Sequence, residues 1–568
     1  MAADPEVIRI GNCSGFYGDR RSAMREMLTE GELDVLTGDY LAEMTMLILG
    51  RDRANDPTLG YAKTFLRQLE ECLGLAIDTG VRIVVNAGGL NPAGLGHRVH
   101  EIAQRLGIGV RVAHVTGDDL SSRAEELGFP GYLTANAYLG AWGIAECLTA
   151  GADIVVTGRT TDAALAVGPA AAHFGWQRTD YDRLAGAVAA GHVIECGAQA
   201  TGGNYAFFTE LTDLAHPGFP IAEMHRDGSS VITKHPDTGG AVTVDTVTAQ
   251  LVYEIDDARY AGPDVTTRLD SITLTEAGPD RVRISGAQGE PPPPDHKVCL
   301  TTVGGHRNEL TFVLTGLDIE AKADLVRTQF EAELPRRPSE LTWTLVRLDQ
   351  ADAATQEQAS ALLRCVGRDP DPDAVGRSFS STAVALALAS YPGFTLTAPP
   401  TNGSVYGAFA PATVNSREVT HRAVLPEGTA VDIEPSPRTQ PLAEVAEPEL
   451  PAAPPAGPTR AVPLGTIAAA RSGDKGGDAN IGVWVRTEPQ WRWLVHELSP
   501  QRLRELLPET AELEISRTLL PRLRAVNFVV HGLLGAGVAA QARFDPQAKG
   551  LGEWLRSRHV AIPEEILS

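Results

Sequence analysis

The sequence predicts an α/β protein whose N-terminal part is a mostly parallel sheet flanked by helices. Over the first 260 residues, short apolar runs alternate with longer helical stretches, a pattern typical of right-handed βαβ units. The apolar runs are rich in Val and Ile and lack polar alternation, as expected of strands covered on both faces. Both observations favour a buried parallel sheet.

The predicted elements follow one another in βαβ order. Strands are expected at residues 7–11, 33–37, 81–86, 109–115 and 153–158, with helices at 20–30, 61–79, 95–106 and 139–150. Residues 221–234 predict a β-hairpin, because Asp227-Gly228 has the composition of a two-residue hairpin turn.

The chain is predicted to divide into four segments. Residues 1–262 form the α/β domain that carries the candidate site, and residues 263–433 mix strand-like and helical stretches typical of a smaller α+β domain. Nine prolines in residues 434–463 predict an extended linker, because this stretch cannot bury enough apolar area to order itself. Residues 464–568 are expected to form a separate compact domain.

Composition and charge exclude several classes of function. Acidic residues outnumber basic ones by 72 to 49, giving a net charge of −23, so we expect neither nucleic acid nor a membrane surface as a partner. The six cysteines lie far apart, and the N-terminus lacks the features of a signal peptide. We therefore predict a cytoplasmic protein with reduced thiols, no cofactor and no metal site; His296, Cys299 and His306 match no closed zinc pattern.

Polar and glycine-rich residues follow every strand of the predicted parallel sheet. Because the carboxyl ends of parallel strands share one edge, towards which helix N-termini also point, these loops should converge on one site for an anionic ligand. The substrate-binding residues predicted at this edge are Asn12, Ser14, Arg20, Asn86, Gly88, Gly89, Asn91, Arg159 and Asp162.

Two carboxylates at these strand ends are candidate general bases. Asp19 has helix capping as its alternative role, and Asp39 has a turn. Arg159 opens a helix in a position suited to a carboxylate or phosphate, with a local pair to Asp162 as the alternative. Cys13 is a weak nucleophile candidate, because no base can be placed beside it.

A second polar cluster lies in residues 191–205. His192 and Glu195 form a candidate acid/base pair beside a glycine-rich backbone, with a core role for His192 as the alternative. The backbone N–H groups at Gly88-Gly89 or Gly202-Gly203 are candidates for stabilising an oxyanion. The substrate-binding residues predicted here are Gly202, Gly203, Asn204 and, further along, Lys234, whose alternative is a solvated loop lysine.

A glycine-rich segment follows the linker. Successive backbone N–H groups in such a loop can form an anion nest, which Lys475 would complete, with a flexible hairpin as the alternative. The residue order is not that of a Walker loop. The anion-binding residues predicted here are Arg471, Ser472, Gly473, Asp474, Lys475, Gly476, Gly477 and Asn480.

Together these stretches resemble the acyclic terpene utilisation protein A family, over most of the chain outside the linker. The stretches that carry the resemblance are 12–20, 38–43, 86–92, 157–162, 202–205 and, in the C-terminal domain, 471–480. The resemblance implies a ferredoxin-like α+β fold for the C-terminal domain. It also implies a place in the degradation of branched terpenoid acids as CoA thioesters, alongside a biotin-dependent acyl-CoA carboxylase, and it carries over no catalytic residue.

The leading hypothesis is an enzyme that acts on a branched acyl-CoA or a related carboxylic acid, as a lyase, hydratase or hydrolase. CoA would be part of the substrate, and Arg159, Lys234, Arg471 and Lys475 would meet its negative charges. One alternative is a non-catalytic partner of an acyl-CoA carboxylase. A homo-oligomer is compatible with the sequence.

A second alternative is an NAD(P)-dependent oxidoreductase. Gly11, Gly15 and Gly18 follow the first predicted strand, and Asp39 lies about twenty residues on, where a ribose ligand would be expected. The spacing of these glycines matches no usual dinucleotide fingerprint, which weakens this hypothesis.

Overall fold

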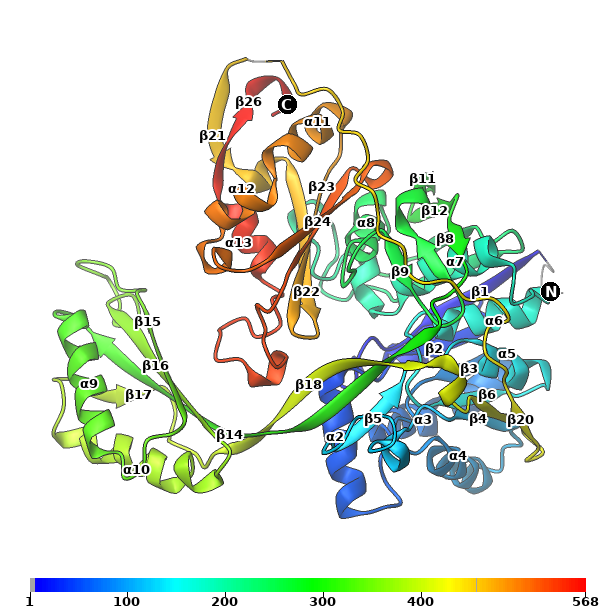
Figure 1. Cartoon of the computed structure of the whole chain (residues 1–568), viewed down its shortest axis with the longest axis horizontal. Helices are drawn as coiled ribbons and strands as arrows, with labels where there is room; N and C mark the ends of the chain where they lie inside the picture. Colours follow the sequence, from blue (N-terminus) through cyan, green and yellow to red (C-terminus); the bar gives the residue numbers. More distant parts are fainter. Residues whose placement is uncertain (1–5, 456, 568) are drawn as a thin grey trace. The chain divides into compact units, whose positions relative to one another are not determined.

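The computed structural model describes residues 6–455 and 457–567, and the chain divides into two compact units (Figure 1). The larger unit comprises Met1–Thr301, Phe409–Val538 and Gln547–Ser568, and the smaller one comprises Thr302–Ala408 and Ala539–Pro546. The smaller unit is therefore narrower than the α+β domain predicted for residues 263–433, because the first part of that segment packs into the larger unit.

Five parallel strands form the middle of an 11-stranded sheet in the larger unit. In spatial order they are β1 (Val7–Asn12), β2 (Val35–Gly38), β3 (Arg82–Val85), β6 (Ile154–Thr157) and β4 (Val112–Thr116). Nearly all their residues are buried, which explains why the apolar runs show no alternation. The predicted parallel sheet is confirmed.

Antiparallel strands extend this sheet on both sides. On one side lie β7 (Pro220–His225), β8 (Ser230–Lys234), β12 (Arg281–Ser285) and β11 (Thr273–Gly278), and on the other β19 (Arg422–Val424) and β20 (Ala430–Asp432). β7 and β8 form the predicted hairpin. β11 and β12 differ from expectation: they join the large sheet, where Val282 and Ile284 of β12 are buried, and do not belong to a separate α+β domain.

Helices cover both faces of the parallel strands. One face packs against α1 (Ala23–Thr29), α3 (Lys63–Thr79) and α4 (Pro92–Leu106), and the other against α5 (Trp142–Thr149), α6 (Ala164–Phe174) and α7 (Tyr181–Ile194). Two further helices, α2 (Glu43–Asn55) and α8 (Val244–Leu251), complete the helices of this part. Within the described residues, no helix combines the length and apolar character needed to cross a bilayer.

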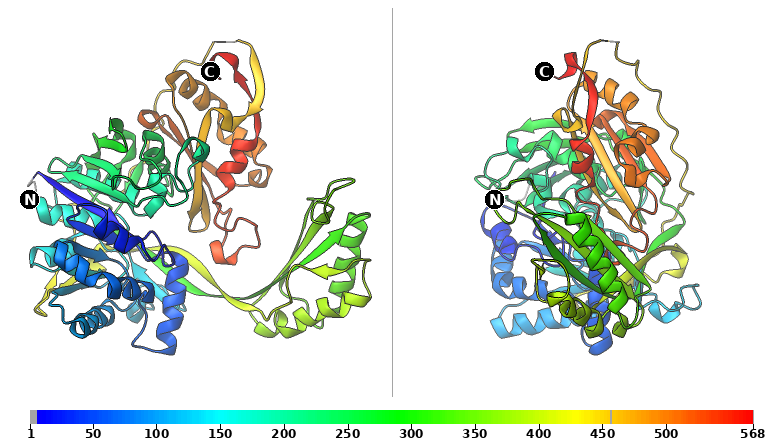
Figure 2. Two further views of the ribbon diagram at one scale, coloured as in Figure 1. Left: turned by 180° about the vertical axis from the view of Figure 1, so that it is seen from behind. Right: turned by 90° about the vertical axis from the view of Figure 1, so that its left-hand side faces the viewer.

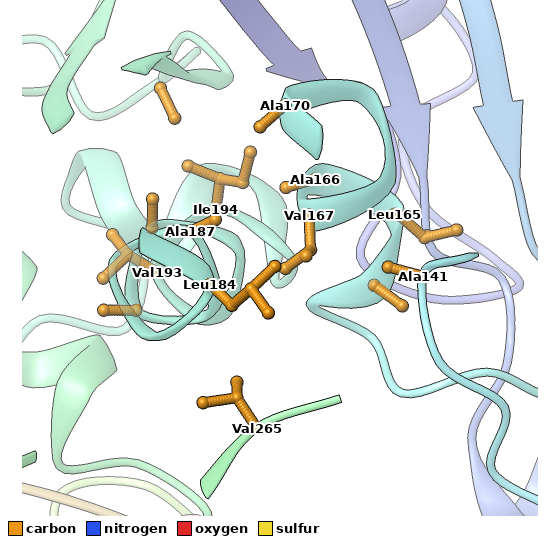
Figure 3. Close-up of a cluster of buried hydrophobic side chains, with 14 of the residues drawn as sticks. Ala141, Leu165, Ala166, Val167, Ala170, Leu184, Ala187, Val193, Ile194 and Val265 are labelled. Carbon is orange, nitrogen blue, oxygen red and sulfur yellow. The ribbon is translucent and has the colours of Figure 1, made fainter. Parts of the chain in front are cut away.

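Helices α6 and α7 pack against each other in the buried cluster of Figure 3, where Val167, Leu184 and Ile194 lie between them. A Cβ atom on Gly191 of α7 would lie 2.9 Å from Cα of Ala163, so only glycine allows this approach. Since Ala163 follows the polar loop after β6, the close packing brings the end of α7 to the carboxyl edge of the sheet.

The C-terminal domain also belongs to the larger unit. Its sheet has the order β22 (Ala468–Lys475), β23 (Asp478–Val485), β25 (Ala525–Val530), β24 (Ile515–Leu520). The apolar face of this sheet packs against α11 (Glu488–Glu497), α12 (Pro500–Leu506) and α13 (Leu551–Ser557), drawn in orange and red in Figure 2. The end of the predicted linker, Thr459–Pro463, forms β21, which pairs with β26 (His559–Pro563).

Short strands complete the larger unit, and the smaller unit is an α+β fold. The short strands are β5 (Thr134–Ala137), β9 (Arg259–Ala261), β10 (Thr266–Arg268) and β13 (Gln288–Glu290). The sheet of the smaller unit is built from β14 (Asp295–Thr315), β15 (Glu340–Val346), β16 (Ser360–Asp369), β17 (Thr395–Leu396) and β18 (Ser404–Asn415), of which β14 and β18 begin or end in the larger unit. Its helices are α9 (Ile319–Glu333) and α10 (Arg377–Ala385). The core of the smaller unit is built around Phe312, Phe330 and Phe379.

Candidate functional site

Asp39 and Asn86 form a buried pair at the ends of β2 and β3. Asn86 Nδ2 donates to Asp39 Oδ1 at 2.6 Å, and Asn86 Oδ1 accepts the N–H of Tyr40 at 2.7 Å. Burial and the nearby carboxylate of Asp162 raise the pKa of Asp39 well above its usual value, although Arg159 acts in the opposite direction. The site thus disfavours the charged form of Asp39 relative to water.

Arg159 follows β6 and is almost completely buried, with 3% of the residue exposed. Nη1 donates to the carbonyl of Leu41 at 3.0 Å and to Asp162 Oδ1 at 3.2 Å. Nη2 donates to the hydroxyl of Tyr138 at 3.2 Å, and the guanidinium lies 4.4 Å from the centre of the Tyr138 ring. The structure therefore contains the local pair with Asp162 that was the alternative to ligand binding, and it fixes a buried cation at the strand ends.

His192 and Glu195 come together at the end of α7. Nε2 of His192 donates to the carbonyl of Tyr253 at 3.1 Å, because a carbonyl can only accept, and its Nδ1 lies 3.2 Å from Glu195 Oε1. Burial lowers the pKa of His192 to about 4, so the imidazole is neutral at pH 7. Burial, Asp162 and Glu254 raise the pKa of Glu195 well above its usual value.

The C-terminal domain contributes two lysines to this cluster from within the same unit. Lys475 Nζ donates to the carbonyl of Glu254 at 2.6 Å, and Lys549 Nζ donates to Glu254 Oε1 at 3.1 Å and to the hydroxyl of Tyr253. Although burial pushes the pKa of Glu254 upward, Lys549 and Lys475 hold it below its usual value. The charges of Glu254 and Lys475 act in turn on Glu195, so both domains shape one electrostatic site.

Arg471 and Asn480 hold the two domains together beside these lysines. Arg471 donates to the carbonyl of Asn204 at 3.4 Å and to the side chain of Gln199, and its guanidinium lies 4.3 Å from the centre of the Tyr253 ring. Asn480 Oδ1 accepts the N–H of Glu254 at 2.7 Å. The C-terminal segment thus reaches the N-terminal cluster within one chain.

The predicted anion nest differs from the observed structure. Arg471 to Lys475 lie in β22 and pair residue by residue with β23, and only Gly476 and Gly477 form the turn. In an extended strand, successive N–H groups point in opposite directions and cannot converge on one anion as they do in a nest. Ser472 is also engaged, since its Oγ donates to the carbonyl of Lys549 and accepts the N–H of Gly552.

Several predicted ligand residues make local hydrogen bonds that hold loops in place. Asp19 accepts the N–H groups of Gly15 and Arg20, and Arg20 pairs with Glu26 at 2.6 Å. Asn91 caps α4 by accepting the N–H of Gly94 at 2.9 Å. These residues lie at the sheet edge as predicted, but each has a local structural role.

The remaining predicted residues follow the same pattern. Ser14 donates to the carbonyl of Phe16, whereas Asn12 reaches the cluster by donating to the carbonyl of Glu195 at 3.4 Å. Gly88 and Gly89 pack against neighbouring backbone, and Gly202 and Gly203 end the 3-10 turn Gly197–Thr201, beside Asn204. Lys234 donates to the carbonyl of Thr238 and pairs with Asp280 at 3.3 Å, so its contacts lie outside the cluster.

Sequence reasoning missed Tyr138, Tyr253, Glu254 and Lys549. One signal could have found the lysine: the chain has only six lysines among 49 basic residues, so each one stands out. Lys297 is another, since its Nζ lies 5.2 Å from the centre of the Tyr138 ring. Among the described residues, no group of three or more His, Cys, Asp or Glu is arranged to hold a metal ion.

The glycine-rich loop after β1 is filled by protein. A Cβ atom on Gly15 would lie 2.7 Å from the backbone carbonyl carbon of Cys196. The next helix, α1, begins only at Ala23, whereas a dinucleotide loop leads directly into its helix. Close packing therefore accounts for this glycine. Burial raises the pKa of the nearby Cys13 thiol, which makes Cys13 poorly suited to act as a nucleophile.

Comparison with known proteins identifies the family. The sequence model of the acyclic terpene utilisation family protein AtuA matches residues 8–425, and the model of the AtuA ferredoxin-like domain matches residues 462–561. The chain belongs to the AtuA family. The match confirms the resemblance to this family and the ferredoxin-like fold of the C-terminal domain, and it associates the chain with acyclic terpene utilisation. No curated protein and no solved structure matches the chain.

Proposed function

We propose that this AtuA-family protein is an enzyme that acts on a branched acyl-CoA or a related carboxylic acid, and that Glu195 transfers a proton in its reaction. The observation that carries the proposal is the state of the Glu195 carboxyl. The residue is 8% exposed, its pKa is raised, and Oε2 has no hydrogen-bond partner among the described residues. A buried carboxyl group whose pKa is raised, and which has one oxygen without a hydrogen bond, is suited to general acid/base chemistry.

His192 provides the partner for this proton. Because its Nε2–H is directed to the Tyr253 carbonyl, its Nδ1 presents a lone pair to Glu195. In the proposed reaction a proton passes between Oε1 and Nδ1, which lie 3.2 Å apart, and Oε2 meets the reacting group of the substrate. Adding or removing a proton beside a thioester carbonyl is the step that lyase and hydratase reactions share, and these classes are favoured over hydrolysis at this site.

The cations of the cluster support an anionic substrate. Proton removal next to a thioester places negative charge on its oxygen, and a positive group nearby lowers the energy of that state. Lys475 acts electrostatically on Glu195, and so does Arg159 from the strand ends. The phosphates and carboxylates of CoA substrates would be attracted by the same cations.

The experiment begins with thermal-shift screening of the full-length protein against CoA thioesters, free branched acids and dinucleotides. A ligand that binds only the folded state raises the melting temperature. Turnover of the best thioester is then measured for the wild type and for Glu195→Gln, which keeps the shape and removes the proton. We expect a loss of about 10²- to 10⁴-fold in kcat.

The matched control is Glu126→Gln, because the Glu126 carboxylate is 65% exposed and pairs only with Arg123 on the surface. It should turn over the substrate like the wild type. Wild-type turnover by Glu195→Gln would refute the proposed role of Glu195. Stabilisation by a dinucleotide alone would favour the oxidoreductase alternative, and a stable complex with an acyl-CoA carboxylase without turnover would favour the accessory role.

A further inference from the structure

Three side chains on one face of the C-terminal sheet form a hydrogen-bonded chain from a hydroxyl through an imidazole to a carboxylate. Ser516 Oγ lies 2.7 Å from Nε2 of His531, and Nδ1 of His531 lies 3.0 Å from Oδ2 of Asp478. The three residues come from different parts of the domain, so sequence neighbourhood does not impose the contact. None of them belongs to the strand-end cluster.

The sheet sets this arrangement through its register. Asp478 begins β23, His531 directly follows β25 and Ser516 lies in β24, and these three strands are adjacent in the sheet. Ala479 pairs with Val530, so Asp478 lies opposite His531, and Ser516 pairs with Val529, two residues before His531. Residues two apart on a strand share a face, which brings the three side chains together.

Hydrogen bonding fixes the imidazole tautomer. Asp478 Oδ1 also accepts the N–H of Gly532 at 2.7 Å, so the carboxylate is held by two contacts. Since a carboxylate only accepts, Nδ1 of His531 carries the hydrogen and Nε2 presents its lone pair to the Ser516 hydroxyl. This is the arrangement in which a histidine activates a serine as a nucleophile.

The edge of the sheet supplies a donor for an oxyanion. The N–H of His531 donates to the carbonyl of Glu514, which fixes the hydrogen-bonded pairs of the ladder between β24 and β25. Because the backbone N–H groups of a strand point alternately to either side, the N–H of Ser516 points towards β25 and that of Arg517 points away from it. β24 is an edge strand, and no described residue accepts a hydrogen bond from that N–H. The residue after the nucleophile donates to the oxyanion in many serine hydrolases.

We propose that Ser516, His531 and Asp478 form a second active site, for acyl transfer from an ester or thioester to water. Ser516 Oγ forms a bond to the acyl carbon while its proton moves to Nε2 of His531. The bond to the alcohol or thiol leaving group then breaks, and the leaving group takes that proton. Water attacks the acyl-serine, gives its proton to His531, and the free acid leaves as Ser516 regains its hydrogen.

Access supports this role. The side chain of His531 is 38% exposed and that of Asp478 is 34% exposed, and Ser516 is on the surface. A substrate can therefore reach the hydroxyl without a conformational change. The proposal is independent of the one for Glu195, because it uses other residues and another bond.

The test is covalent labelling of the full-length protein with a fluorophosphonate probe, followed by peptide mass spectrometry, and hydrolysis of p-nitrophenyl acetate and acetyl-CoA. We expect the probe on Ser516, and a loss of hydrolysis of about 10³-fold or more in Ser516→Ala. His531→Gln should abolish labelling, and Asp478→Asn should slow it at least about 10-fold, because the amide favours the wrong tautomer.

Ser229→Ala is the matched control. Ser229 Oγ donates to Asp227 at 2.7 Å without an intervening imidazole, so it should neither take up the probe nor affect hydrolysis. Absence of label on Ser516 overturns the proposal, as does hydrolysis that Ser516→Ala leaves intact. All four substitutions lie near the surface, and unchanged melting temperatures would separate lost chemistry from lost folding.

Discussion

The strand-end cluster and the C-terminal sheet each place a histidine against a carboxyl group, but with opposite tautomers. His192 is nearly fully buried, donates from Nε2 to a carbonyl and turns Nδ1 to Glu195. His531 is partly exposed, donates from Nδ1 to Asp478 and turns Nε2 to Ser516. The comparison teaches that the hydrogen bond donated by one ring nitrogen decides which nitrogen is left with a lone pair for its neighbour.

The largest stability effect should come from removing the buried cation. Arg159→Leu leaves the Leu41 carbonyl and the Tyr138 hydroxyl without their donor and Asp162 without its cation. Breaking a buried ion pair costs about 3–5 kcal/mol, and the partial exposure of Asp162 places the expected loss at the lower end of that range. Urea unfolding of the variant and the wild type measures it.

Arg111→Leu is the exposed counterpart. The Arg111 side chain is 60% exposed and pairs with Asp153 at 2.8 Å, so its loss should cost less than about 1 kcal/mol. If Arg159→Leu and Arg111→Leu lower the free energy of unfolding equally, then burial does not make the Arg159 ion pair more important for stability than a surface pair.

His192 should make the protein less stable in mild acid. The pKa of His192 in the folded protein is about 4, below the usual 6.5. Between pH 4 and pH 6.5, the unfolded chain therefore binds a proton at His192 that the folded chain does not bind. Stability is therefore lost as the pH falls, on the order of 2 kcal/mol between pH 7 and pH 5. His192→Gln should remove this part of the pH dependence, measured by urea unfolding at both pH values.

Thr160→Val is the control for that experiment. The Thr160 hydroxyl is buried beside Arg159 without a hydrogen-bond partner among the described residues, and it does not titrate in this range. This variant should keep the wild-type dependence on pH. If His192→Gln keeps it too, then His192 is not held neutral in the folded protein.

The smallest effect separates helix capping from ligand binding. Asn91→Ala removes the cap of α4 and should cost about 1 kcal/mol, whereas Asn91→Asp keeps an acceptor for the N–H of Gly94 and should cost less. Neither should change the thermal shift caused by the ligand found in the screen. If the ligand raises the melting temperature of Asn91→Ala less than that of the wild type, then Asn91 contributes to ligand binding.

The parallel sheet and its polar edge were predictable because their signals are local. Strands such as Ile154–Thr157 are unbroken apolar runs, and the polar loops follow them directly in the sequence. β5, by contrast, reads Thr-Ala-Asn-Ala and gave no strand signal, since its burial comes from pairing with β14. β11 and β12 look like strands of any sheet, and only tertiary pairing assigns them to the large one.

The site was predictable in part for the same reason. Arg159, Asp39 and Asn86 follow strands, whereas Glu254 and Lys549 meet across 295 residues of sequence with no pattern to connect them. Asp19 and Asn91 accept hydrogen bonds that a turn and a helix cap require. A single sequence cannot distinguish such residues from residues that bind a ligand. The three glycines, two cations and polar residues of 471–480 predict a loop, whereas residues 471–475 pair with 478–482 in a ladder.

The contact between Glu254 and Lys549 has a consequence for synthesis. Domains at the start of a chain fold while the ribosome is still translating the rest. The N-terminal sheet can therefore be complete long before the lysine that balances Glu254 exists, and a nascent chain carries an acidic, unfinished site until residue 549 has emerged. A chain interrupted before residue 549 would therefore keep Glu254 without this lysine partner.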